Sequence, residues 1–219
     1  MRILVIIPAY NAAATLPGVL QGVLQQCRPD DVIVIDDGST DGTAEAATRS
    51  GAGVSRSPRN EGKGAALRRG FAQALLRGCD AVVTLDADGQ HPPRLIPELL
   101  RRAADGRCDI VIASRRRGFG GMSPERALSN LLTTLIVSLL AGTRLQDSQC
   151  GFRLIRTGLL RRLSPAAGGF QAESELLVQA GRLGADIGHI DCPVIPSPAS
   201  HIGHVRDTLR FLALCLRYL

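Results

Sequence analysis

The chain has 219 residues, of which 45% are hydrophobic and 21% are charged; this length and composition suit one large domain and exclude a disordered chain. Its formal charge of +6 is uneven, because residues 1–110 carry 13 basic and 13 acidic side chains whereas residues 111–219 carry 13 and 7. Aromatic residues make up only 3% of the chain, and without a recognisable nucleic-acid-binding motif we expect no nucleic acid partner.

The first half of the chain alternates strand-like and helix-like segments. Continuous apolar runs predict buried strands at residues 3–7, 32–35, 81–85 and 108–113. Amphipathic patterns predict helices at residues 15–26, 41–50, 64–77 and 92–104. Such alternation is typical of a doubly wound α/β fold, in which ligands bind at the carboxyl ends of the strands.

After residue 113 this alternation ends. Residues 115–123 form a basic, glycine-rich loop, and residues 124–141 predict an apolar helix. A strand, a helix, a strand and a final helix follow, at residues 151–155, 173–183, 187–195 and 205–219. No repeat or low-complexity linker divides the sequence, so we predict a single domain over residues 1–219.

The cysteines and the apolar runs indicate the compartment. Six cysteines are scattered without a CxxC pair, which favours free thiols in a reducing environment. The N-terminal apolar run ends in Pro8 rather than in a small-residue cleavage site, so we interpret it as a strand and not as a signal peptide. No stretch reaches the roughly 18–20 apolar residues of a membrane span. We therefore expect a cytoplasmic protein.

Polar side chains follow the buried runs. Asp86 and Asp88 lie two residues apart after the run at 81–85, with Gln90 two residues further. These hard oxygen ligands suit Mg²⁺ or Mn²⁺, which complete their coordination with phosphate and water. Lys63, the only lysine, precedes a predicted helix, where an ammonium group can meet a phosphate. Taken singly, each segment is also compatible with an ordinary polar turn.

Four segments together are more specific. IPAYNAA, DDGSTDGT, NEGKGAALRRGF and LDADGQHPP occur in this order, the first, second and fourth at strand ends and the third at a helix start. They resemble family 2 glycosyltransferases of the GT-A fold, and most of all the dolichol- or polyprenyl-phosphate mannosyl- or glucosyltransferase branch. Further matches are Ala113-Ser114-Arg115, Asp147 with Cys150-Gly151-Phe152-Arg153, and Glu173-Ser174-Glu175-Leu176-Leu177, so that the resemblance covers about residues 2–195.

The resemblance implies a Rossmann-like, mostly parallel central sheet flanked by helices. It also implies inverting transfer of a sugar from a UDP- or GDP-sugar to a lipid-linked acceptor, such as a polyprenyl phosphate, or to another membrane-associated acceptor. Residues 1–113 would bind donor and metal, and residues 114–219 the acceptor. The donor-binding residues would be Pro8, Tyr10, Asn11, Asp37, Lys63, Asp86, Ala87 and Arg115, and the Mg²⁺ or Mn²⁺ ligands Asp86, Asp88 and Gln90.

Asp147, Glu173 and Glu175 are the catalytic candidates. An anionic phosphate acceptor needs no base, whereas a hydroxyl acceptor needs a carboxylate to take its proton. Glu173 and Glu175 lie about 200° apart on a helix, so we expect only one to face the site, and the sequence does not choose between them.

Two other functions are alternatives for an α/β chain with these motifs. A sugar nucleotidyltransferase would carry a glycine-rich, basic first loop, which residues 9–14 lack. A non-catalytic sugar-nucleotide-binding protein would not need the complete set of Asp86, Asp88 and Gln90.

The last segment predicts a basic amphipathic helix. At about 100° per residue, Arg206, Arg210 and Arg217 share one face. The opposite face carries Leu209, Leu212, Cys215, Leu216 and Leu219. Such a helix either packs on its own domain or lies on an anionic membrane, here as a peripheral contact at the inner face of the cell membrane.

Overall fold

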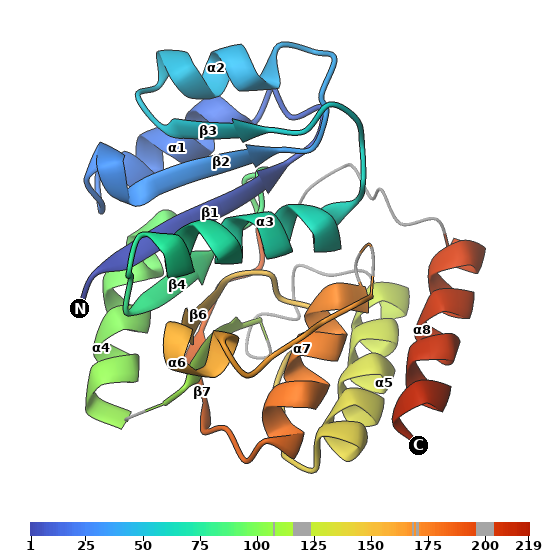
Figure 1. The fold of residues 1–219 in the computed structure, drawn as a ribbon. Helices are drawn as coiled ribbons and strands as arrows, with labels where there is room; N and C mark the ends of the chain where they lie inside the picture. Colours follow the sequence, from blue (N-terminus) through green and yellow to red (C-terminus); the bar gives the residue numbers. More distant parts are fainter. Residues whose placement is uncertain (107, 116–123, 168, 170, 196–203) are drawn as a thin grey trace.

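A central sheet with helices on both sides organises the chain (Figure 1). The computed structural model describes residues 1–106, 108–115, 124–167, 169, 171–195 and 204–219. Most of the basic loop predicted at 115–123, and the side chain of Arg206, therefore lie outside the described residues. The seven strands of the sheet run in the order β3-β2-β1-β4-β6-β5-β7.

The strands are mostly parallel, as predicted. Their bounds are β1 Ile3–Ala9, β2 Val32–Asp36, β3 Gly53–Arg56, β4 Ala81–Thr84, β5 Ile110–Ser114, β6 Arg153–Arg156 and β7 Ile187–Asp191. Only β6 is antiparallel, to both β4 and β5, and it inserts between them. A strand from the second half of the sequence thus joins the strands of the first half, so both halves of the described chain contribute to one sheet.

The helices cover the sheet and extend beyond it. They are α1 Leu16–Leu24, α2 Thr43–Arg49, α3 Lys63–Leu76, α4 Ile96–Gly106, α5 Pro124–Ala141, α6 Thr157–Leu160, α7 Gln171–Arg182 and α8 His204–Tyr218, with short 3₁₀ turns η1 Pro29–Asp31 and η2 Pro93–Leu95. Figure 1 shows α7, α5 and α8 side by side in the lower right, away from β1–β3. None of these helices, within the described chain, is long and apolar enough to cross a bilayer.

Three differences from the predicted elements have local causes. The strand β3 was missed because its residues at the sheet edge are only partly buried and carry no apolar run. The strand predicted at 187–195 ends at Asp191, where its partner strand also ends at Ser114 and Pro193 follows without an amide hydrogen. The short helix α6 was missed because four residues carry too little periodicity. All six cysteines are free, as expected.

The C-terminal helix packs on the domain, but with an unexpected face. Phe211, Leu214 and Tyr218 pack against the core and against α7. The leucines of the predicted apolar face stay exposed, whereas Cys215 is partly buried, and α5 exposes a similar row of residues. We define the α5–α8 leucine surface as Leu128, Leu131, Leu132, Leu135, Ile136, Leu139, Leu209, Leu212, Leu216 and Leu219.

Candidate active site

The loops that follow β1 and β2 are tied together at the carboxyl edge of the sheet. The Asn11 amide donates to Ser39 Oγ at 2.9 Å, and Asn11 Oδ1 accepts from the Thr40 amide at 3.0 Å. Asn11 adopts a positive φ of 49°, a conformation that asparagine tolerates better than most residues. Pro8 and Tyr10 stand beside it, with Tyr10 half exposed. The two loops are thus hydrogen-bonded to each other at the place where the sequence predicts that a nucleoside binds.

Asp37 positions the start of α3. Its buried carboxylate accepts hydrogen bonds from the Glu61 amide and, at 2.7 Å, from the Gly62 amide. Gly62 has a φ of 90°, which a residue with a side chain rarely adopts. The turn formed in this way aims the next residue, Lys63, toward the sheet edge.

Lys63 joins two carboxylates from distant parts of the chain. Its Nζ lies 2.6 Å from Asp86 Oδ1, after β4, and 3.1 Å from Glu173 Oε2, on the first turn of α7. Burial opposes the charge of Lys63, but the two carboxylates outweigh it and raise the pKa of Lys63. Burial likewise opposes the charge of Asp86, and Lys63 nevertheless lowers the pKa of Asp86. Lys63 and Asp86 are therefore both charged at neutral pH.

Gly151 makes the approach of the two carboxylates possible. A Cβ at this position would lie 2.8 Å from Asp86 Oδ2 and 2.9 Å from Glu173 Oε1, inside normal contact distance. Both carboxylates thus converge on the space left by a missing side chain. Carboxylate oxygens are ligands that suit a divalent cation. In this structure the Lys63 ammonium supplies the positive charge between them.

Asp88 and Gln90 complete the acidic loop. Asp88 is exposed, and its Oδ1 accepts a hydrogen bond from the Gln90 amide at 2.9 Å. The carbonyl of Ala87 accepts from Thr15 Oγ1 at 2.6 Å, which fixes the loop to the region before α1. Within the described residues, no group of three or more His, Cys, Asp or Glu side chains could hold a metal ion. A cation here would take further ligands from diphosphate and water.

His91 holds this loop through a hydrogen bond to its backbone, a role that the sequence did not predict. Its Nδ1 accepts the Asp86 amide at 3.1 Å, and its ring stacks on Phe152 with 5.6 Å between centroids. Burial lowers the pKa of His91, so the ring stays neutral and can keep this acceptor. The only sequence signal was its place within LDADGQHPP.

Arg115 and Asp147 form a second buried pair. Arg115 Nε lies 2.8 Å from Asp147 Oδ2, and the Arg115 amide donates to the same oxygen. Asn130 and the Gln149 amide donate to Asp147 Oδ1. Burial opposes both charges, but the pairing raises the pKa of Arg115 and lowers that of Asp147. With its oxygens occupied, Asp147 is placed to hold Arg115 rather than to take a proton.

The two glutamates of α7 face different neighbours. Glu173 reaches Lys63, whereas Glu175 Oε1 accepts hydrogen bonds from Tyr218 Oη at 3.0 Å and from Arg217 Nη1 at 3.1 Å, both on α8. The structure therefore brings Glu173 to the acidic loop and leaves Glu175 as a buried link between α7 and α8. A fully buried Arg153 supports Glu173 by donating to its carbonyl oxygen at 3.0 Å.

The fold and this site fit a glycosyltransferase of the GT-A type. The chain matches the description "Glycosyl transferase family 2" over residues 4–164 and belongs to that family. It is thus a glycosyltransferase, as predicted from the four motifs, which favours glycosyl transfer over the nucleotidyltransferase and non-catalytic alternatives.

Two relatives are named for lipid-phosphate acceptors. An undecaprenyl-phosphate mannosyltransferase of Micrococcus luteus is 34% identical over 206 residues, which are 89% of this chain and 83% of that protein. An undecaprenyl-phosphate 4-deoxy-4-formamido-L-arabinose transferase of Pseudomonas paraeruginosa is 38% identical over 171 residues, 73% of this chain. The match covers only 48% of that second relative. The predicted resemblance to the polyprenyl-phosphate branch is confirmed.

Solved structures of a similar enzyme contain metal and nucleotide. The glucosyl-3-phosphoglycerate synthase of Mycobacterium tuberculosis in complex with Mn²⁺ and UDP-glucose superposes with a TM-score of 0.77 at 27% identity, covering 98% of this chain and 79% of that chain. Its complex with Mg²⁺ and UDP superposes with a TM-score of 0.75 at 28% identity, with the same coverage. The GT-A fold predicted for this chain is confirmed.

Proposed function

We propose that this protein transfers a sugar from a UDP- or GDP-linked donor to a polyprenyl phosphate at the cytoplasmic surface of a membrane. The observation that carries the proposal is the cluster of Lys63, Asp86 and Glu173, in which three charged groups meet at the carboxyl edge of the sheet. The named acceptors of the two relatives support the choice of acceptor.

The donor half would bind the nucleotide-sugar along the sheet edge. Pro8, Tyr10, Asn11 and the loop held by Asp37 would contact the nucleoside. Asp86, Asp88 and Gln90 would hold Mg²⁺ or Mn²⁺ against the diphosphate. The bound ion would neutralise the negative charge that develops on the leaving diphosphate.

Two cationic side chains would stabilise the same charge. The Lys63 ammonium would exchange part of its contact with Asp86 for a diphosphate oxygen, and Glu173 would keep it oriented. Arg115, held by Asp147, would present its guanidinium on the other side. In this scheme Asp147 and Glu173 are positioning residues.

The reaction itself then needs no base. An anionic oxygen of the acceptor phosphate attacks the anomeric carbon opposite the leaving group, so that a new carbon–oxygen bond forms while the bond to the diphosphate breaks. The configuration at that carbon inverts, and the electron pair leaves with the nucleoside diphosphate. No proton has to be removed from the acceptor.

The acceptor half would meet the membrane. The α5–α8 leucine surface exposes ten large apolar side chains on two neighbouring helices. Apolar residues on the surface of a soluble protein are more often scattered singly than gathered in this way. The half of the chain that carries this surface also carries the excess of basic over acidic residues, 13 against 7, which suits an anionic bilayer. We propose that this surface is the peripheral membrane contact.

The test is a transfer assay with the purified chain. Each UDP- and GDP-sugar is supplied with Mn²⁺ and with either undecaprenyl phosphate in anionic vesicles or 3-phosphoglycerate in solution. We expect product with the lipid phosphate, and loss of product when a chelator is added. Transfer to 3-phosphoglycerate without transfer to the lipid would contradict the proposed acceptor, and chelator-resistant transfer would contradict the metal.

A further inference from the structure

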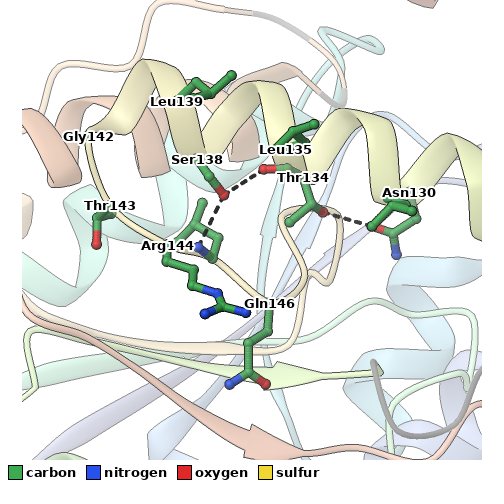
Figure 2. Close-up of a pocket in the computed structure, with 11 residues that line it drawn as sticks. Asn130, Thr134, Leu135, Ser138, Leu139, Gly142, Thr143, Arg144 and Gln146 are labelled. Atoms are coloured by element: carbon green, nitrogen blue, oxygen red, sulfur yellow. Dashed lines mark hydrogen bonds between the residues drawn. The ribbon is translucent and has the colours of Figure 1, made fainter.

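A groove runs along α5 on the side where residues 142–146 return toward the sheet. It has a volume of about 500 Å³, within the usual range of roughly 300–1,000 Å³ for small-molecule sites. Figure 2 shows its lining along α5 and the following loop. We call it the α5 groove; it is lined by Asn130, Leu131, Thr134, Leu135, Ser138, Leu139, Gly142, Thr143, Arg144, Leu145 and Gln146.

One wall of the α5 groove is apolar. Leu131, Leu135 and Leu139 recur every four residues and form one ridge of the helix, exposed to solvent. A second exposed ridge, Leu128, Leu132 and Ile136, runs beside the first but does not line the groove. The helix thus presents two rows of exposed aliphatic side chains, of which only one borders the α5 groove.

Part of the floor of the groove is polar, and the hydroxyls of Thr134 and Ser138 there are hydrogen-bonded within the protein. Thr134 Oγ1 donates to Asn130 Oδ1 at 3.0 Å, and Ser138 Oγ donates to the Thr134 carbonyl at 2.6 Å. Ser138 Oγ also accepts a hydrogen bond from the Leu145 amide at 3.1 Å. A hydrocarbon chain can therefore cover these two hydroxyls without leaving them unpaired, which would be unfavourable. The longer polar side chains of Arg144 and Gln146 also line the groove.

One end of the groove reaches the active-site pair. Asn130 lines the groove and donates to Asp147 Oδ1 at 3.2 Å, and Asp147 in turn holds Arg115. The charge of Arg115 also acts on Asp86. A molecule with a phosphate near Arg115 could therefore extend its remaining chain along the groove.

We infer that the α5 groove binds the isoprenoid chain of the lipid acceptor, next to its phosphate. This inference rests on the proposed function, which makes a polyprenyl phosphate the acceptor. A slim apolar chain fits the apolar wall of Leu131, Leu135 and Leu139, and it can cover the Thr134 and Ser138 hydroxyls, which already have partners. The groove would bind the first isoprene units while the rest of the chain stays in the membrane.

Binding can be measured without activity, because the chain contains no tryptophan. Thr143→Trp places a single fluorophore in the groove, and Leu132→Trp places one on the adjacent ridge outside it. Titration with farnesyl phosphate below its micelle concentration should shift the Thr143→Trp emission to the blue and leave Leu132→Trp unchanged, and inorganic phosphate should shift neither. Equal responses at both positions, or none at Thr143→Trp, would overturn the groove assignment.

Kinetics with soluble acceptors provide the second test. The ratio of kcat/KM for farnesyl phosphate to that for dimethylallyl phosphate measures what the chain contributes. We expect Leu135→Gln to lower this ratio about tenfold by changing the farnesyl value, and Leu132→Gln, of similar exposure, to leave it unchanged. Equal ratios in both variants would overturn the inference. A fluorescence shift without any transfer to either phosphate would instead retain the groove and reject the proposed function.

Discussion

The carboxyl edge of the sheet and the α5–α8 leucine surface use the same chain in opposite ways. At the sheet edge, charged groups from distant segments are brought together and paired, as Lys63 is with Asp86 and Glu173. On α5 and α8, large apolar side chains are left without a partner in the described structure. The folding free energy gained by burying leucine is forgone there, which is understandable if a lipid covers the surface in use.

This contrast also separates two kinds of charged residue. Asp86 and Glu173 converge beside Gly151, where both contact the Lys63 ammonium. Asp147 and Glu175 are more deeply buried than Asp86, yet their oxygens are occupied by donors of the protein itself. Burial of a carboxylate therefore does not by itself indicate a catalytic role. The groups that contact its oxygens are the better indication.

The largest expected effect is on the acidic loop. Asp86→Asn should lower kcat/KM by about 10³-fold, because it removes a negative charge that positions Lys63 and the cation at the leaving diphosphate. The measurement is steady-state transfer with Mn²⁺. Asp30→Asn, in η1 at the opposite end of the strands, is the matched control and should retain full activity. Equal rates in both variants would contradict the site.

The two glutamates of α7 should separate activity from stability. Glu173→Gln should lower kcat by about 10²-fold with little change in Tm, since it weakens the orientation of Lys63. Glu175→Gln should mainly lower Tm, because Arg217 and Tyr218 lose an anionic acceptor. Activity and thermal unfolding of both variants check this, and the reverse pattern would mean that Glu175 serves the reaction.

Removal of Asp147 should destabilise the protein by about 3 kcal/mol at neutral pH, because Arg115 would be left buried without its partner. The pKa of Asp147 is lowered in the folded state, so its contribution is present above the unfolded value of about 3.9 and is lost as the pH falls through the folded value. Urea unfolding of Asp147→Ala and of the unaltered chain should therefore differ most near neutrality and converge in acid. A difference that stays constant with pH would show that the ion pair is not its source.

The smallest effect concerns the leucine surface. Leu212→Gln together with Leu216→Gln should weaken binding to anionic vesicles by about 1 kcal/mol for each leucine, through the loss of apolar area. Co-sedimentation with vesicles measures this binding. Leu76→Gln, on α3 and even more exposed, is the control and should bind normally. An equal loss in the control would mean that the leucine surface has no special part.

Most of the sheet could be predicted because its signals are local. Runs such as residues 3–7 and 32–35 are apolar on both faces, and only a central parallel strand buries both. The strand β3 escaped because an edge strand needs no such run. The position of β6 between β4 and β5 was also not predicted, because the pairing of strands far apart in the sequence leaves no local pattern.

The candidate site divides along the same line. The sequence alone indicated the GT-A framework through its resemblance to family 2 glycosyltransferases, and it placed Asp37, Lys63 and Asp86 at strand and helix ends that local patterns define. Only the tertiary structure decided that Glu173 rather than Glu175 meets Lys63, and that α8 packs through Phe211 and Tyr218 while its leucines face outward. A helical repeat defines which residues share a face, but the neighbouring elements determine which face is covered.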